Sequence, residues 1–170
     1  MQNIEIKTPL ADRAFVEETL RNLGASRQWK LRQRDTFFEV PRGWLKIREQ
    51  EGRDSEMISY RRSTEESGPR ASDYDVEPLR DAETWKRLLE RVLQRRGVVE
   101  KQRTLWLLRH TRIHLDRVEG LGDFLELETL VHTITPSEAA AETDEIIDSL
   151  NLDRSGFLSV PYLELMPGNG

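Results

Sequence analysis

The residues best suited to carry chemistry lie in one segment, residues 109–131, which reads RHTRIHLDRVEGLGDFLELETLV. Polar and apolar side chains alternate on both sides of a glycine-containing turn at residues 119–123, and this pattern predicts a β-hairpin. Because side chains alternate across a strand, the polar faces of the two arms carry Asp116 on one and Glu126 and Glu128 on the other. Grouped carboxylates suit a hard divalent cation such as Mg²⁺ or Mn²⁺.

The pairing of the two arms decides how these acids meet. We assume a register that pairs Val118 with Phe124, which places Asp116 opposite Glu126 and His114 opposite Glu128. Like charges that face each other across two strands destabilise a sheet, so this register requires a metal ion or a basic ligand-binding wall nearby. Half-solvated antiparallel strands also alternate polar and apolar residues. The hairpin alone is therefore equally consistent with an ordinary sheet whose charged face is exposed to solvent. We expect a structural pair for His114 rather than a role as general base.

The same alternation recurs in other segments, with the charges sorted by sign. Residues 3–7, 44–48, 56–62 and 98–108 each read as strands that carry charged residues between aliphatic ones. Acids are concentrated on the first and last of the predicted strands, and bases dominate the strands between them. The acidic positions are Glu5, Asp116, Glu126 and Glu128; the basic positions are Lys7, Lys46, Arg48, Arg62, Lys101, Arg103 and Arg112.

Helices and turns complete the predicted order of elements. Helices are expected at residues 9–23, with Thr8 as the cap, at 81–94, and at 136–150, with Thr135 as the cap. Further strands are expected at residues 25–40 and 70–77, a loop at 63–69, and an apolar tail at 157–166 that docks onto the rest. No repeat or linker divides the chain, so residues 1–170 are expected to form a single domain.

The composition excludes several classes of protein. The 170 residues include no cysteine, which rules out disulfides, thiolate catalysis and zinc-thiolate sites. The net charge of -5 argues against a general nucleic-acid surface. No apolar segment predicts a signal peptide or a membrane span. We therefore expect a cytoplasmic protein that binds neither nucleic acid nor membrane.

The sorted charges predict a fold. An α+β protein, with a closed antiparallel eight-stranded β-barrel and helices packed outside, would cover the aliphatic faces and turn the charged faces into a tunnel. A barrel of about eight strands can hold one small ligand. Buried charges need partners, so the bases require a polyanion and the acids require a metal ion. A metal-bound polyphosphate satisfies both requirements.

The chain resembles the CYTH superfamily of triphosphate tunnel metalloenzymes, which includes class IV adenylyl cyclases and thiamine triphosphatases. The family's ExExK signature corresponds to Asn3, Glu5 and Lys7, and its LKxR element to residues 45–48. The pattern TRIHLDxVExLGxFxExE matches residues 111–128 closely. Asn3 departs from the family, because the signature has a glutamate there. The hairpin looks most similar to the class IV cyclase branch.

The resemblance implies roles for individual residues. Glu5, Glu126 and Glu128 correspond to metal ligands, and Asp116 to a ligand or to a residue that orients one. The residues expected to bind phosphate are Lys46, Arg48, Arg62, Lys101, Arg103 and Arg112; those expected to act in catalysis are Lys7, Arg112 and Asp116. The number and affinity of bound metal ions are open, because an amide at position 3 brings no charge.

The implied activity is a Mg²⁺- or Mn²⁺-dependent reaction at phosphorus. One reaction converts ATP to cyclic AMP and pyrophosphate; the other hydrolyses an inorganic or organic triphosphate. The expected partner is accordingly a nucleoside triphosphate or inorganic triphosphate, bound by a monomer or a homodimer. The alternative is a non-catalytic module that binds nucleotide or polyphosphate, an interpretation that Asn3 makes reasonable.

Overall fold

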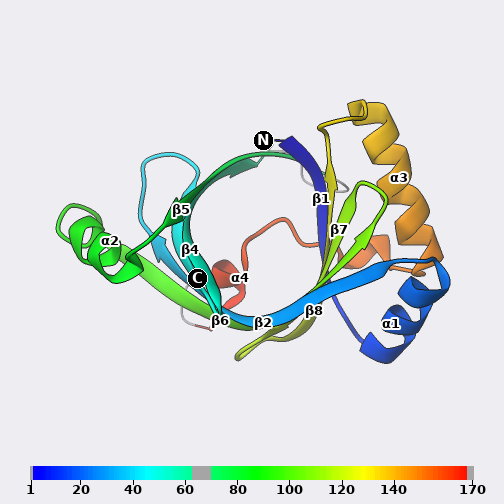
Figure 1. Ribbon diagram of the computed structural model, residues 1–170, viewed down its shortest axis with the longest axis horizontal. Helices are drawn as coiled ribbons and strands as arrows, with labels where there is room; N and C mark the ends of the chain where they lie inside the picture. Colours follow the sequence, from blue (N-terminus) through cyan, green and yellow to red (C-terminus); the bar gives the residue numbers. More distant parts are fainter. Residues whose placement is uncertain (1, 63–69, 168–170) are drawn as a thin grey trace.

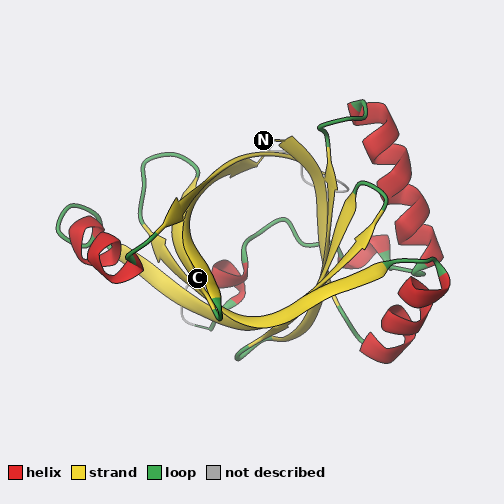
Figure 2. Ribbon diagram, in the orientation of Figure 1, coloured by secondary structure: helices red, strands yellow, loops and turns green. Residues whose placement is uncertain are grey.

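Eight antiparallel strands close into a barrel, with helices on the outside (Figures 1 and 2). The computed structural model describes residues 2–62 and 70–167, and the side chains of residues 62 and 70–72 lie outside that description. Around the barrel the strands follow the order β1, β5, β4, β3, β2, β6, β7, β8, and β8 pairs with β1 to close it. This arrangement confirms the predicted fold class.

The strands are β1 (Gln2–Pro9), β2 (Ser26–Phe38), β3 (Trp44–Gln50), β4 (Arg53–Arg62), β5 (Arg70–Leu79), β6 (Arg95–Leu108), β7 (Thr111–Val118) and β8 (Gly122–Leu130). The helices are α1 (Arg13–Asn22), α2 (Ala82–Leu89), α3 (Pro136–Ser149) and the short α4 (Tyr162–Leu165), with a 3₁₀ turn at Arg154–Gly156. Within the described residues, no helix has the length and apolar character needed to cross a bilayer.

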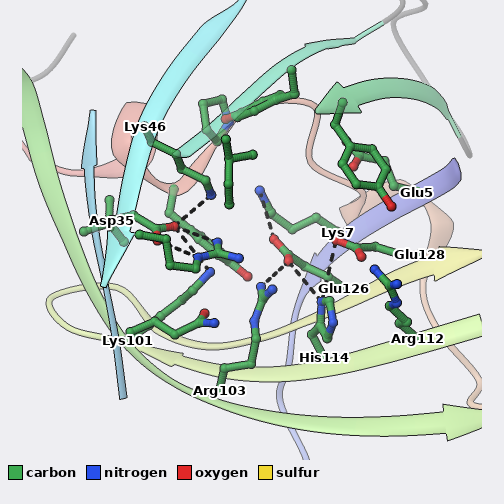
Figure 3. A pocket seen from close by; sticks show the side chains of 18 of the residues that line it. Glu5, Lys7, Asp35, Lys46, Lys101, Arg103, Arg112, His114, Glu126 and Glu128 are labelled. Carbon is green, nitrogen blue, oxygen red and sulfur yellow. Dashed lines mark hydrogen bonds and ion pairs between the residues drawn. The ribbon is translucent and has the colours of Figure 1, made fainter. Parts of the chain in front are cut away.

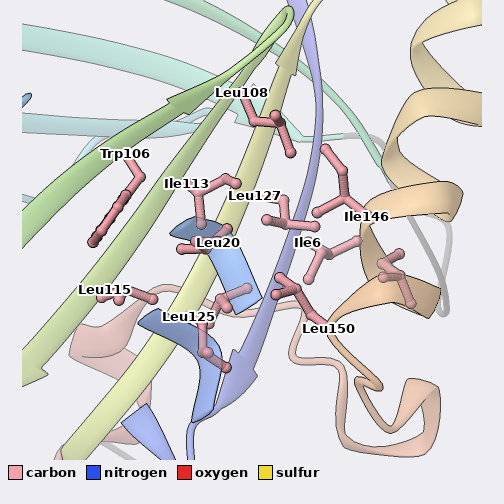
Figure 4. Close-up of a cluster of buried hydrophobic side chains, with 12 residues drawn as sticks. Ile6, Leu20, Trp106, Leu108, Ile113, Leu115, Leu125, Leu127, Ile146 and Leu150 are labelled. Carbon is pink, nitrogen blue, oxygen red and sulfur yellow. The ribbon is translucent and has the colours of Figure 1, made fainter. Parts of the chain in front are cut away.

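The alternation along each strand separates two environments. Charged side chains point into the lumen of the barrel (Figure 3). The aliphatic side chains of the opposite faces point outward, where α1 and α3 cover one side of the barrel and α2 covers the other (Figure 1). A few aliphatic side chains, among them Val99 and Leu105, line the lumen with the charged ones. Ile6, Ile113 and Leu127 on the strands pack with Leu20 of α1 and Ile146 of α3 (Figure 4). Burial of these apolar faces is the main force that holds the helices on the barrel.

The register assumed for the hairpin of β7 and β8 is wrong by two residues. Val118 pairs with Gly122 rather than Phe124, which places His114 opposite Glu126 and Arg112 opposite Glu128. The turn is shorter than expected because Gly120 and Gly122 adopt φ angles of 78° and 102°, a backbone conformation that glycine alone adopts at little cost. The shift keeps the inward face unchanged. It removes the expected repulsion between Asp116 and Glu126 as directly opposed residues, and gives each glutamate of β8 a basic residue opposite it.

The first two helices are shorter than expected. Pro9 pairs with Phe124 as the last residue of β1, so Thr8 lies in the strand and does not cap a helix. Helix α1 begins at Arg13, where the side chain of Asp12 accepts a hydrogen bond from the backbone amide of Phe15. Helix α2 ends at Leu89 rather than at residue 94, because the chain turns there and enters β6 early. The loop expected at 63–69 lies outside the described residues.

The third helix and the tail agree with expectation. Thr135 caps α3 through a capping box with Glu138. The tail docks where the backbone amide of Leu158 donates to the carbonyl oxygen of Lys7 at 2.8 Å. Tyr162 and Leu163 are buried, and Tyr162 lines the lumen, so the tail forms part of the wall of the site.

Candidate functional site

The lumen contains a cavity of about 470 Å³, a size typical of small-molecule sites. Nine of the residues predicted from the sequence line it: Glu5, Lys7, Lys46, Arg48, Lys101, Arg103, Arg112, Glu126 and Glu128. Asp116 is fully buried behind this lining. The side chain of Arg62 is outside the described part of the structure. The strands thus bring together residues that are more than 100 positions apart in the sequence, such as Glu5 and Glu128.

Asp35 of β2 organises one side of the lumen. Its carboxylate accepts two hydrogen bonds from Arg48, at 2.7 and 2.8 Å, and one from Lys46 at 2.8 Å. The ammonium of Lys101 lies 3.9 Å away. Three cations from β3 and β6 therefore converge on a single carboxylate that is only 2% exposed (Figure 3). This arrangement holds the cations in place and faces them toward the cavity.

Asp116 of β7 holds a second pair of cations. Arg103 donates to it through Nε at 2.7 Å and Nη2 at 2.5 Å, and Lys101 lies 3.3 Å from it. Bidentate pairs of this kind set the plane of the guanidinium. Arg103 also donates to Glu126. Asp116 thus positions Lys101 and Arg103, and Lys101 links the Asp35 and Asp116 groups.

Lys7 of β1 lies between the acids and the tail. Its ammonium is 3.3 Å from Glu126 and donates to the carbonyl oxygen of Val160 at 3.1 Å. It also lies 4.2 Å from the centre of the Tyr162 ring, close enough for a cation–π interaction. These contacts fix the ammonium at the edge of the cavity, beside the carboxylates of β8.

The acids of β1 and β8 form the other side of the lumen. Glu5 pairs with Glu128 across the two strands, so two like charges face each other there. His114 of β7 lies beside Glu126 and Glu128, with its Nδ1 3.8 Å from Oε2 of Glu126 and 3.7 Å from Oε1 of Glu128. These three side chains, His114, Glu126 and Glu128, offer ligand atoms within 4.8 Å of one another and could hold a metal ion. The donor chemistry fits a divalent cation, because carboxylate oxygens predominate and Nδ1 makes no hydrogen bond among the described residues.

Burial and neighbouring charges shift the pKa values of the site strongly. Burial alone would raise the pKa of Asp116, but the charges of Arg103 and Lys101 lower it to about 2. The same opposition, with Arg48, Lys46 and Lys101 prevailing over burial, holds the pKa of Asp35 well below its ordinary range. Burial and the charge of Arg48 lower the pKa of Lys46 to about 7. The carboxylates are therefore charged at neutral pH, and Lys46 can change its charge there.

Among the lumen residues not predicted from the sequence, Asp35 and Tyr162 contact the cations of the site. Asp35 lies in β2, where Gln33, Asp35 and Phe37 share the inward face; this alternation was a signal that could have identified it. Tyr162 approaches the cations from the tail, outside the barrel strands, and no local pattern indicates that contact.

Known proteins share this architecture over nearly the whole chain. A protein of Methanocaldococcus jannaschii named as a candidate adenylate cyclase is 26% identical over 97% of this chain and 98% of its own length. The solved structure of the PH1012 protein from Pyrococcus horikoshii superposes with a TM-score of 0.83 at 24% identity, over 96% of this chain and 99% of the other. A candidate adenylyl cyclase from Hippeastrum, whose structure is described as revealing a dominant triphosphatase activity, superposes with a TM-score of 0.60 at 15% identity, over 95% and 94% of the chains.

The family assignment rests on the sequence as well as on the fold. The model of the CYTH domain matches residues 1–158. That range includes every strand of the barrel and every charged residue of the lumen described above. The chain therefore belongs to the CYTH domain family.

Proposed function

We propose that this protein is a metal-dependent enzyme that binds a triphosphate in the barrel lumen and promotes attack at one of its phosphorus atoms. The observation that carries the proposal is the division of the lumen into two sides. On one side Asp35 and Asp116 hold four cations, Lys46, Arg48, Lys101 and Arg103; on the other side Glu5, Glu126 and Glu128 gather. A chain of phosphates with a bound divalent ion matches this division in charge.

The cations would bind the phosphate oxygens and stabilise the charge that develops on them. Asp116 would keep Lys101 and Arg103 oriented, while Lys7 and Arg112, beside the carboxylates, would contact the reacting phosphate. Glu126 and Glu128, together with Glu5, would hold a Mg²⁺ or Mn²⁺ ion. When bound there, such an ion would supply Lewis-acid polarisation of the phosphorus and would neutralise charge on the phosphate oxygens.

Two reactions use such a site. Hydrolysis of inorganic or organic triphosphate agrees with the activity named for the Hippeastrum protein. Conversion of ATP to cyclic AMP and pyrophosphate agrees with the name of the Methanocaldococcus jannaschii relative. A family likeness alone does not choose between them. Asn3 favours a further candidate, a binding module without turnover, because its amide replaces the glutamate of the family signature.

Product analysis separates these candidates. The protein is incubated with Mg²⁺ or Mn²⁺ and either ATP or inorganic triphosphate, and the products are resolved by chromatography. Orthophosphate supports hydrolysis, and cyclic AMP with pyrophosphate supports cyclisation. Tight binding without product supports the module. Absence of both binding and turnover would contradict the proposed function altogether.

Two variants test the two sides of the lumen. Glu126→Gln should abolish metal-dependent turnover because it removes a carboxylate from the acidic side; Glu119→Gln, at an exposed acid of the same hairpin, is the control. Lys101→Ala should weaken triphosphate binding, with the exposed Lys30→Ala of β2 as its control. Wild-type activity in both lumen variants would contradict the proposal. Asn3→Glu, titrated with Mn²⁺, measures whether the departure at position 3 changes the demand for metal.

A further inference from the structure

We infer that His114 is a direct ligand of the divalent ion, and that its nitrogen makes this centre favour a transition ion over Mg²⁺. The inference rests on the proposed function, because it names a ligand and a selectivity for the ion that the lumen is proposed to hold. His114 would join Glu126 and Glu128 as a ligand, with Glu5 and phosphate oxygens completing the centre. A nitrogen ligand in place of another oxygen changes which ion binds best.

The position of the imidazole supports coordination. His114 is 5% exposed, and its Nδ1 makes no hydrogen bond to any described residue. A buried polar atom without a hydrogen bond lowers the stability of the folded protein by about 1–3 kcal/mol. A ligand that contacts such an atom inside a cavity would remove this penalty. Nδ1 lies 3.8 Å from Oε2 of Glu126 and 3.7 Å from Oε1 of Glu128. These separations are too long for hydrogen bonds.

The same separations suit an ion between the atoms. Two ligands that each lie about 2.1 Å from one ion can be up to about 4.2 Å apart. Both distances from Nδ1 fall below that limit. All three ligand atoms lie within 4.8 Å of one another, so a small rotation of either glutamate brings them to a common ion.

The register of the barrel explains why the histidine is there. His114 faces Glu126 across β7 and β8, and Glu126 faces Lys7 across β8 and β1. The three candidate ligands therefore lie on two neighbouring strands of a closed sheet, not on a loop. Pre-positioned ligands on rigid elements are what a specific metal centre requires.

The residue at position 3 supplies a second reason. Asn3 lines the same lumen, is 2% exposed, and has an Oδ1 without a hydrogen bond among the described residues. The first strand thus offers one carboxylate, Glu5, where two acids would give a harder and more negative centre. Imidazole adds a donor without adding charge, and it binds first-row transition ions better than Mg²⁺, which prefers oxygen ligands.

Metal and triphosphate should bind together. In the structure Glu126 is held by Arg103 and Lys7, and the phosphate oxygens would compete with Glu126 for both cations when the triphosphate binds. That change frees Glu126 to coordinate the ion. Tripolyphosphate should therefore raise the affinity of the protein for the ion.

Pulsed electron paramagnetic resonance of Mn²⁺ tests direct coordination. Mn²⁺ is the strictest probe because it binds most weakly among the first-row divalent ions. The wild-type protein with Mn²⁺ and tripolyphosphate should show nitrogen modulation from a coordinated imidazole, and the modulation should change when histidine is labelled with ¹⁵N. Mn²⁺ bound only to carboxylates and phosphates shows no such coupling. Because this measurement uses the wild-type protein, it does not depend on the folding of a variant.

Affinity measurements test selectivity. In His114→Gln, the affinity for Mn²⁺ should fall by about 10-fold or more, a loss of the size that even outer-shell substitutions cause, while the affinity for Mg²⁺ should change by less than about 3-fold. His132→Gln, at an exposed histidine, is the control and should leave both affinities unchanged.

The outcomes separate the two proposals. Tight Mn²⁺ binding without nitrogen modulation, or equal losses of Mn²⁺ and Mg²⁺ affinity in His114→Gln, would overturn the role of His114 and leave the proposed function standing. If the wild-type protein with tripolyphosphate binds no divalent ion, the proposed metal dependence fails together with this inference.

Discussion

Replacement of Asp35 by asparagine removes the carboxylate on which Lys46, Arg48 and Lys101 converge. The shape of the side chain is kept, so the change isolates the charge. Two of the three cations are almost completely buried around it: Lys46 is 9% and Lys101 6% exposed, and Asp35 itself 2%. The side chain of Arg48 is 12% exposed. Asp35→Asn removes the anion that Lys46 and Arg48 contact and leaves Lys101 with Asp116 alone, which should destabilise the barrel in the absence of ligand.

The magnitude follows from the contacts. Removal of one partner of a buried ion pair costs about 3–5 kcal/mol. Lys46 can relieve part of this by losing its proton, since its pKa is already lowered to about 7. Arg48 cannot do so, and it loses two hydrogen bonds to a charged acceptor. At pH 8 we therefore expect the free energy of unfolding to fall by about 3 kcal/mol, a large part of the 5–15 kcal/mol typical of a domain.

Urea unfolding with and without tripolyphosphate measures the effect. A bound polyanion supplies the missing negative charge, so saturating tripolyphosphate should stabilise Asp35→Asn more than it stabilises the wild type. Asp75→Asn, at an exposed position of β5, is the control and should change stability by less than about 0.5 kcal/mol. If Asp35→Asn is as stable as the wild type, or gains no more than the wild type from tripolyphosphate, the view that Asp35 holds the cations for a polyanion is refuted.

The effect also depends on pH in a defined way. The pKa of Asp35 is lower in the folded protein than in the unfolded chain, so its stabilising contribution is complete above the unfolded pKa of about 4 and is lost as the pH falls through the folded value. As the pH falls through the folded pKa of Asp35, protonation of Asp35 removes this contribution from the wild type, so the difference in stability between the wild type and Asp35→Asn should decrease in this acidic range. A difference that still grows as the pH falls through this range would contradict this sign.

Three further predictions concern single contacts. The pKa of Lys46 is about 7 in the free protein, so a bound polyanion should restore the positive charge of Lys46. Binding of tripolyphosphate at pH 8.5 should therefore take up close to one proton. Calorimetry in two buffers of different ionisation enthalpy measures this proton uptake, and equal binding heats in the two buffers would contradict the prediction. Thr135→Ala, which removes the capping box of α3, should lower stability by about 1 kcal/mol in urea unfolding without changing tripolyphosphate affinity. Gly43→Ala should lower the stability of the protein more than Gly52→Ala. Both glycines have φ near +70°, but only a Cβ at Gly43 would lie 2.7 Å from the carbonyl oxygen of Tyr60. Equal losses of stability in the two variants would show that backbone strain, and not the close approach to Tyr60, determines the effect.

The faces of the strands could be predicted because alternation is a local property. Lys46 and Arg48 share a face with each other whatever the rest of the chain does, and the same holds for Glu126 and Glu128. Once a closed barrel is assumed, the sign of the charge on each strand divides the lumen into a basic and an acidic side. The capping box at Thr135 could be predicted for the same local reason, as two short contacts within one turn of helix.

The pairing between strands could not be predicted in this way. A shift of two residues leaves every side chain on its own face, so the pattern around Val118 fits partners Phe124 and Gly122 equally well. The glycines of the turn select the pairing of Val118 with Gly122. Similarly, Thr8 and Pro9 can begin a helix locally, but pairing of Pro9 with Phe124 extends the strand through them.

The sequence by itself determined which charged side chains of one strand share a face, such as Lys46 with Arg48 and Glu126 with Glu128, because this follows from alternation along single strands. Only the tertiary structure decided that Asp35 holds three cations, that Tyr162 meets Lys7, and that His114 lies between two glutamates. These contacts join segments distant in the chain, and their distances depend on register and closure. The lowered pKa of Lys46 likewise arises only when folding buries it beside Arg48.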